Sequence, residues 1–225
     1  MVTRKTGAGP ENRFLLVRAA LLLVLAGCGG RSPAQEPAPE PPVPPRALYS
    51  APLSGQKISV LPLTLLLAET PLNTQAPFID RATALHWADS VLGYALQNRA
   101  PEIGWVLPAE LRRIARRAPG IAPDPDRMGQ SVMGAPKLAA MPDPLRSYAR
   151  SLVALAGGRS LLIPAAFSFS PTASGGVKAE LSIVLADSRN GQVIWRTLMP
   201  GEGATPELAL QAALKTMLPL PSDTP

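Results

Sequence analysis

Three polar residues near the middle of the chain have the side-chain types of a hydrolytic active site. His86, Asp89 and Ser90 are three and four positions apart, so a helix would place them on one face. In a nucleophilic hydrolase the serine attacks, the histidine takes its proton, and a carboxylate orients the histidine. Those groups normally come from separate elements, with the nucleophile on a sharp turn beside an oxyanion hole. No such turn is evident around Ser90, so we expect a solvated or capped polar face and no enzyme.

Four arginines make a second cluster that could bind a ligand. They lie on one side of a predicted helix, opposite Leu111, Ile114 and Ala115, and they are Arg112, Arg113, Arg116 and Arg117. Like charges four positions apart repel mildly, whereas cations near the carboxyl end of a helix are favourable. Two interpretations stay open: a solvated face, or a contact surface for an anionic partner such as an acidic protein, a lipid headgroup or a wall polymer. Together with the irregular segment 119–142, these arginines form the candidate partner-binding surface.

Metal, cofactor and nucleic-acid chemistry have little support in the composition. The chain has one histidine, His86, and one cysteine, Cys28, so a His/Cys metal cluster cannot be assembled. The pairs Gly157-Gly158 and Gly175-Gly176 follow no phosphate-loop pattern and indicate a helix end and a turn. Aromatic residues are only 4% of the chain and form no basic, aromatic platform, so nucleic acid is not expected as a partner. We expect no metal and no cofactor.

The single cysteine ends a short apolar segment near the amino terminus. Basic residues precede this segment at positions 4, 5, 13 and 18, the apolar core covers 19–26, and small residues flank Cys28. The core is far shorter than the roughly 18–20 residues that span a bilayer, so it predicts a secretory signal and not a transmembrane helix. An ordinary signal peptide with an incidental cysteine is the alternative to a lipidation site.

Leu25-Ala26-Gly27-Cys28 resembles the lipobox of bacterial lipoproteins. The resemblance implies cleavage between Gly27 and Cys28, a thioether-linked diacylglycerol on the Cys28 sulfur, and acylation of the new amino terminus with palmitate. Several acyl chains, at about 0.8 kcal/mol per buried methylene, would anchor the chain stably in a membrane. Because Gly29 and not aspartate follows the cysteine, the resemblance also implies the outer membrane, with the domain in the periplasm.

Proline content divides the mature chain. Removing the predicted signal peptide 1–27 lowers the formal net charge from +6 to +3 and leaves about 198 residues, enough for one domain. Proline lacks an amide donor and fixes φ, so the proline-rich residues 28–54 are predicted to form a disordered tether. At roughly 3.1 Å per residue this tether would reach about 60 Å at most. The folded domain is predicted at 55–220 and a disordered tail at 221–225.

Hydrophobic periodicity predicts a single α/β domain with a mixed sheet, flanking helices and an antiparallel carboxy-terminal hairpin. The predicted elements are strand 57–67, helix 80–98, strand 103–107, helix 108–118, irregular segment 119–142, helix 143–157, strands 160–168, 177–186 and 192–199, and helix 205–217. Asn190-Gly191 is the strongest hairpin signal. The buried stripe of helix 143–157 is predicted to be Leu145, Tyr148, Leu152 and Leu155. Three methionines of the irregular segment are interpreted as adaptable contacts or as cover for the core: Met128, Met133 and Met141.

Three parts of the domain resemble a group of envelope lipoproteins. They are the opening segment 58–63, the hairpin 187–195 and the helix after Thr205-Pro206. The group contains the curli-secretion-channel lipoprotein and the lipoprotein activators of penicillin-binding proteins, and the resemblance implies a non-enzymatic domain that works through protein contacts. The chain departs from the channel member because it lacks a pair of long amphipathic hairpins that could enter a bilayer. We predict an accessory or binding module for an envelope protein in cell-envelope assembly; the alternative is a self-associating, homo-oligomeric component of a secretion or transport complex.

Overall fold

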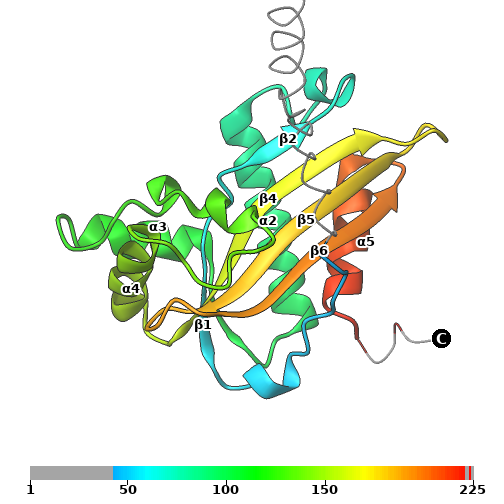
Figure 1. Cartoon of the computed structure of the whole chain (residues 1–225). Coiled ribbons are helices and arrows are strands. Elements are labelled where there is room, and N and C mark those ends of the chain that lie inside the picture. The colour runs from blue at the N-terminus through cyan, green and yellow to red at the C-terminus, as the bar shows by residue number, and fades with distance from the viewer. Residues whose placement is uncertain (1–42, 221–222, 224–225) are drawn as a thin grey trace, which may run out of the picture. The chain divides into compact units, whose positions relative to one another are not determined.

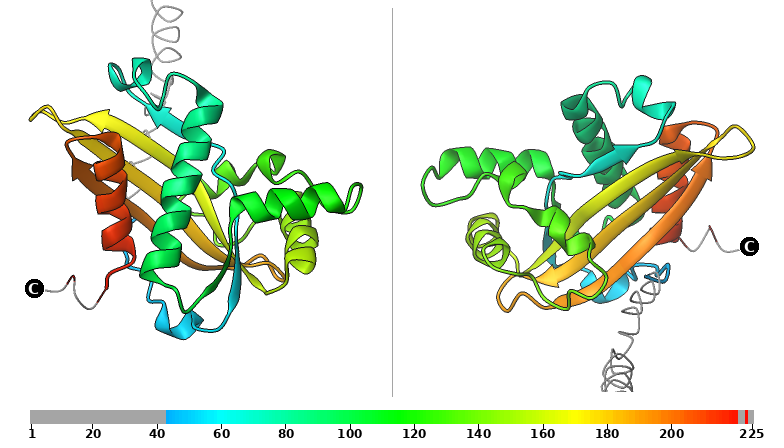
Figure 2. Two further views of the ribbon diagram at one scale, coloured as in Figure 1. Left: turned by 180° about the vertical axis from the view of Figure 1, so that it is seen from behind. Right: turned by 45° about the horizontal axis from the view of Figure 1, so that its top comes forward.

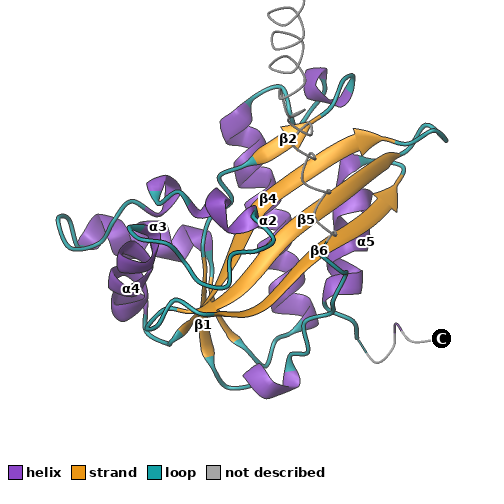
Figure 3. Cartoon of the chain, viewed as in Figure 1, coloured by secondary structure: helices purple, strands orange, loops and turns teal. Residues whose placement is uncertain are grey.

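A mixed sheet of six strands organises residues 43–220 and 223, the part of the chain that the computed structural model describes (Figures 1 and 3). The strands are β1 (Lys57–Val60), β2 (Leu66–Ala68), β3 (Gly104–Val106), β4 (Ser160–Pro171), β5 (Val177–Asp187) and β6 (Val193–Gly203). The helices are α2 (Arg81–Arg99), α3 (Pro108–Arg117), α4 (Leu145–Ala156) and α5 (Pro206–Met217). Short 3-10 helices are η2 (Ala51–Leu53), η3 (Leu72–Thr74), η4 (Pro125–Arg127) and η5 (Gln130–Gly134). The predicted signal peptide, Gly27 and Cys28 lie outside the described residues.

The strands follow the order β3-β1-β4-β5-β6, and β2 pairs with β4 farther along its length than β1 does. β1 runs parallel to β3 and β4, and β2 runs parallel to β4, whereas β4, β5 and β6 are antiparallel. The turn at Asn190-Gly191 joins β5 to β6 as predicted, and Gly191 adopts a φ of 79° that suits glycine. The predicted α/β fold with a mixed sheet and an antiparallel carboxy-terminal hairpin is confirmed.

The predicted strand 57–67 is divided into two strands. β1 ends at Val60, β2 begins at Leu66, and Pro62 lies between them. Proline has no amide hydrogen to donate to a neighbouring strand, so the ladder cannot continue through it. The partner strand β4 also has a register shift between Pro164 and Ala166, which separates the stretch paired with β1 from the stretch paired with β2.

Two helices, α2 and α5, cover one face of the sheet (Figure 2). Both begin with a side-chain cap. Asp80 Oδ2 accepts a hydrogen bond of 2.6 Å from the Thr83 amide, and Thr205 Oγ1 accepts one of 3.3 Å from the Leu208 amide. The helix starts that we predicted at Asp80 and at Thr205 are therefore confirmed.

The other face of the sheet is covered at one end, by α3, α4 and the segment 119–142 (Figures 1 and 2). The predicted buried stripe of α4 is wrong at two positions, because Tyr148 is 40% exposed and Leu155 is 43% exposed. The helix instead buries Ala149, Val153 and Ala156 along with Leu145 and Leu152. The predicted and the observed buried stripes both have helical spacing, so periodicity alone did not distinguish them. The observed stripe contains smaller residues, which allow α4 to pack closely against its neighbours.

Residues at both predicted boundaries of the domain make contacts with it. The Leu48 amide donates to the Met217 carbonyl at 2.7 Å, and the Arg46 amide donates to Thr197 Oγ1 at 2.9 Å. The predicted tether 28–54 therefore includes residues that hydrogen-bond to α5 and β6, because the non-proline residues among its prolines keep their amide donors. Within the predicted tail 221–225, Asp223 forms ion pairs with Arg99 and Lys215.

Candidate functional site

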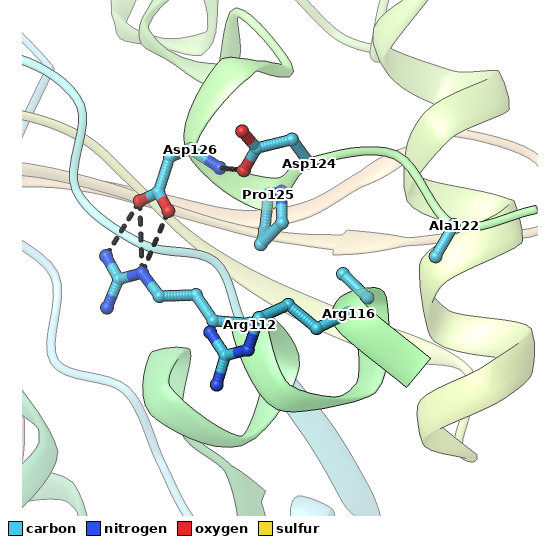
Figure 4. A pocket seen from close by; sticks show the side chains of 7 residues that line it. Arg112, Arg116, Ala122, Asp124, Pro125 and Asp126 are labelled. Carbon is cyan, nitrogen blue, oxygen red and sulfur yellow. Dashed lines mark hydrogen bonds and ion pairs between the residues drawn. The ribbon is translucent and has the colours of Figure 1, made fainter. Parts of the chain in front are cut away.

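Arg112, the first of the four predicted surface arginines, is an internal connector. Its side chain is 16% exposed and joins α3 to α2 and η4. Arg112 Nη2 donates to Asp89 Oδ2 at 2.9 Å, and the same guanidinium bonds both carboxylate oxygens of Asp126 (Figure 4). An arginine held by two carboxylates has its donors used in fixed directions, so Arg112 positions α3 and is not available to a partner.

Asp89 is buried and completes this connection from the α2 side. Its Oδ1 accepts a hydrogen bond of 2.8 Å from the Leu63 amide, in the chain segment between β1 and β2. Burial raises the pKa of Asp89, while the Leu63 amide and Arg112 act in the opposite direction. The hydrogen bonds that Arg112 donates to Asp126, with further contributions from those to Asp89, raise the pKa of Arg112 above its ordinary value despite burial. The guanidinium therefore stays charged and neutralises the buried carboxylate.

The remaining arginines of α3 are exposed. Arg113 forms an ion pair with Glu110, one turn earlier in the helix. Within residues 43–220 and 223, Arg116 and Arg117 make no hydrogen bond or ion pair with their side chains. The four predicted surface arginines therefore differ in environment. Arg112 points inward, Arg113 pairs with Glu110 on its own helix, and Arg116 and Arg117 are exposed and have no partner among the described residues.

Arg116 borders a surface hollow of about 350 Å³ between α3 and η4 (Figure 4). The residues that line it are Arg112, Ala115, Arg116, Ala122, Asp124, Pro125 and Asp126. Asp124 and Asp126 are joined by a hydrogen bond of 3.1 Å from the Asp126 amide to Asp124 Oδ1, which closes the first turn of η4. The hollow is therefore bordered by fixed carboxylates on the η4 side and by a free guanidinium on the α3 side.

His86, Asp89 and Ser90 are on one helix but do not form a catalytic relay. The Ser90 hydroxyl donates to the backbone carbonyl of His86 at 2.8 Å, which is a common helix-internal bond for serine. Both oxygens of Asp89 are occupied by the Leu63 amide and Arg112. The Ser90 hydroxyl thus bonds within α2, and the Asp89 carboxylate connects α2 to α3 and to the segment before β2.

The segment 119–142 is held by a residue that the sequence analysis missed. Gln130 is fully buried, and its Nε2 donates to the carbonyls of Pro62 and Pro125, at 2.9 Å each. It thereby ties η5 to η4 and to the chain between β1 and β2. Its partners lie 68 and 5 residues away, so no local pattern marks Gln130 in the sequence.

The three methionines of the same segment belong to the core. Met128, Met133 and Met141 are all buried and join the cluster under α3 and α4. Their interpretation as core cover is confirmed, and the interpretation as adaptable surface contacts is wrong.

The described residues offer no group of three or more histidine, cysteine, aspartate or glutamate side chains suited to a metal ion. Among the helices in residues 43–220 and 223, none is both long and apolar enough to cross a membrane.

Comparisons with known proteins give structural similarities only. No protein-family model and no curated protein matches the chain. Among solved structures, the PelC dodecamer from Paraburkholderia phytofirmans is similar over 78% of this chain and 93% of its own, with 16% identity and a TM-score of 0.37.

Two further structures show the same level of similarity. The LpoB C-terminal domain from Salmonella enterica covers 67% of this chain and 82% of its own, with 17% identity and a TM-score of 0.35. Lipoprotein GNA1162 from Neisseria meningitidis covers 66% of this chain and 81% of its own, with 15% identity and a TM-score of 0.32. These neighbours belong to the group of bacterial envelope lipoproteins that the sequence resembles, but at 15–17% identity and TM-scores of 0.32–0.37 they establish neither membership of that group nor a role for this chain.

Proposed function

We propose that this chain is a lipid-anchored envelope protein whose α/β domain is a non-enzymatic binding module for an acidic partner protein. The observation that carries the proposal is the division of α3 into two sides. Arg112 fixes the helix from inside, whereas the exposed Arg116 and Arg117 form no ion pair with a carboxylate among the residues that the structure describes. The proposed location at the envelope is supported by the motif Leu25-Ala26-Gly27-Cys28, which predicts a lipid on Cys28, and by the proline-rich segment that follows it.

A fixed helix favours recognition of carboxylates. A guanidinium presents several donors in a planar fork that matches a carboxylate, which makes exposed arginines effective partners for acidic side chains. Arg112 joins α3 to Asp89 and Asp126 on two other elements, so the helix does not need to be ordered when a partner binds. Pre-ordering of this kind lowers the entropic cost of association.

The domain is proposed to work as an accessory to an envelope protein in the periplasm, held near the outer membrane by its anchor. The polar residues that resemble a triad support this non-enzymatic role. Asp89 accepts hydrogen bonds from Arg112 and from the Leu63 amide, and the Ser90 hydroxyl donates to a carbonyl of its own helix. A self-associating component of a secretion or transport complex remains the competing function, and the same experiment separates the two.

The test is in-cell crosslinking of the full-length protein, with mass spectrometry of the crosslinked products, for the parent and for an Arg116→Gln, Arg117→Gln double variant. Loss of two exposed interfacial arginines should lower partner capture about tenfold or more. Surface substitutions of this kind should change the free energy of unfolding by less than about 0.5 kcal/mol. Arg112 is left unchanged because its loss would leave Asp89 buried without its cation.

The matched control is an Arg46→Gln, Arg189→Gln double variant, which removes the same charge from exposed side chains on other parts of the domain. This control should capture the partner as the parent does. Equal capture by the α3 variant would reject α3 as the contact surface. Crosslinks between copies of the chain alone would reject the partner-binding proposal and favour the homo-oligomeric alternative.

A further inference from the structure

A groove lies between α2 and α5, which run side by side on the same face of the sheet (Figure 2). Its volume is about 580 Å³, and its lining residues are Val91, Tyr94, Ala95, Asn98, Arg99, Leu208, Gln211, Ala212, Leu214 and Lys215. Two large residues on its rims face solvent: Tyr94 is 70% exposed and Leu208 is 50% exposed. The groove therefore has an exposed apolar side chain on each of its two helices, with the smaller apolar residues Val91, Ala95 and Ala212 partly exposed between them.

One end of the groove is basic and already holds a carboxylate. The Arg99 guanidinium forms an ion pair with Asp223, and Lys215 Nζ lies 3.3 Å from Asp223 Oδ1. Arg99 is also fixed in direction, because its Nε donates to the Leu218 carbonyl at 2.7 Å. Asp223 Oδ2 accepts a further hydrogen bond of 3.0 Å from the Leu220 amide. The carboxylate is thus held from two helices and from the chain just after α5.

We propose that the groove between α2 and α5 is a docking site for a partner segment that combines apolar side chains with a carboxylate, and that Asp223 occupies its basic end in the free protein. Charge complementarity supports this occupant, since Arg99 and Lys215 make the end cationic and a carboxylate is seen to fit there. The apolar walls supply the second part of the specificity, because exposed aromatic and aliphatic rims are typical anchors for bound peptides.

Asp223 makes the site self-limiting. It lies only a few residues beyond the end of α5. Because the connection is short, the effective concentration of the Asp223 carboxylate near Arg99 and Lys215 is high. A partner carboxylate must displace it before the groove is filled. Removal of the Asp223 charge should therefore increase the affinity for an acidic partner segment and leave the α3 surface unaltered.

The test uses full-length protein and a fluorescent peptide with the sequence of residues 218–225, Leu-Pro-Leu-Pro-Ser-Asp-Thr-Pro, which contains both apolar residues and a carboxylate. Fluorescence polarisation measures its affinity for the parent and for an Asp223→Asn variant. The variant should bind the peptide at least tenfold more tightly than the parent. A control peptide with Asn in place of its Asp should lose this gain.

Two further substitutions are made in the Asp223→Asn background, at exposed positions that should not affect folding. Lys215→Gln should weaken the peptide affinity at least threefold, and Tyr94→Ala should weaken it by a similar factor through loss of the rim. Thermal unfolding confirms that each variant is folded. The inference is overturned if parent and Asp223→Asn bind both peptides equally, or if neither substitution changes the affinity.

Two controls separate the groove from the α3 surface and from self-association. The Arg116→Gln, Arg117→Gln variant should bind the peptide as the parent does, so failure of the α3 proposal and failure of the groove proposal are distinguishable. Sedimentation of the Asp223→Asn variant over a range of concentrations tests the second copy as occupant. If the variant associates as its concentration rises and the peptide reverses this association, the groove binds another copy of this chain, and the proposal of a partner segment is rejected.

Discussion

Asp187 holds the turn between β5 and β6 with both of its carboxylate oxygens. Oδ1 accepts from the Arg189 amide at 2.7 Å and, at 3.4 Å, from the Asn190 amide, while Oδ2 accepts from Arg159 Nε at 2.6 Å. Burial acts to raise the pKa of Asp187, but the hydrogen bonds from Arg159, Arg189 and Asn190 outweigh it and lower the pKa below its usual 3.8. The charged form of Asp187 is therefore favoured by folding.

The resulting pH dependence has a definite sign. Because the folded-state pKa is the lower one, the stabilisation by Asp187 is present above the unfolded pKa of about 3.8 and is lost as the pH falls through the folded pKa. Asp187→Asn should lower the free energy of unfolding by about 1–3 kcal/mol at pH 7, as for loss of hydrogen bonds to a charged group. Urea unfolding at pH 7 and below pH 4 measures this difference, which should shrink at the acid end. A difference that stays constant with pH would contradict the role of the carboxylate charge.

At the scale of elements, the contact between α5 and β6 depends on glycine. A Cβ atom added at Gly201 would lie 2.3 Å from the Ala213 amide nitrogen and 2.4 Å from the Ala209 carbonyl oxygen. A Cβ atom added at Gly203 would lie similarly close to the backbone of Leu208 and Ala209. The strand and the helix can approach this closely because neither glycine has a side chain. The same approach sets the wall of the groove that α5 forms with α2.

Gly201→Ala should therefore destabilise the domain strongly. The clash is with backbone atoms, which cannot rotate away, so we expect a loss of about 3 kcal/mol or more in the free energy of unfolding, at the upper end for overpacking. Gly134→Ala is the matched control, since its added Cβ would meet nothing closer than 3.9 Å. Chemical denaturation of the two variants measures the difference. A Gly201→Ala protein as stable as the control would mean that α5 can move away from β6.

At the scale of the whole molecule, a predicted anchor and a predicted tether precede one domain that carries two separate candidate surfaces. The α3 surface carries Arg116 and Arg117, and the groove between α2 and α5 ends at Arg99 and Lys215. Segments far apart in sequence build both. A domain with two such surfaces could hold one partner through α3 while a second segment competes with Asp223 at the groove.

The anchor gives a prediction for the whole molecule. Cys28→Ser removes the only thiol in the sequence, and with it the predicted attachment point of diacylglycerol. The variant should lose palmitate labelling and move from the membrane fraction to the soluble fraction, because several acyl chains are needed for stable anchoring. Cell fractionation with labelled palmitate checks both. If the parent itself carries no label, the ordinary signal peptide is the correct interpretation of residues 1–28.

Much of the fold could be predicted because its signals are local. The cap at Asp80, the first-turn proline at Pro108 and the Asn190-Gly191 turn act within a few residues of themselves, and the elements that they begin or join appear in the structure. The exposed side of α4 was not predictable in the same way, because two adjacent stripes have equal helical spacing. Gln130 left no signal at all, since its partners are carbonyls that every residue carries.

By itself, the sequence determined the order and type of the four helices and of most strands, the α/β class and the motif that predicts lipidation at Cys28, because these depend on neighbouring residues and their intrinsic preferences. Only the tertiary structure decided which arginines of α3 are free and which carboxylate occupies the end of the groove. Arg112 is inward because Asp89 and Asp126, on two other elements, meet it in space, and Arg99 is covered because Asp223 returns to it from beyond α5. Charge and spacing name the candidates for such pairs, but only the packing of distant segments selects among them.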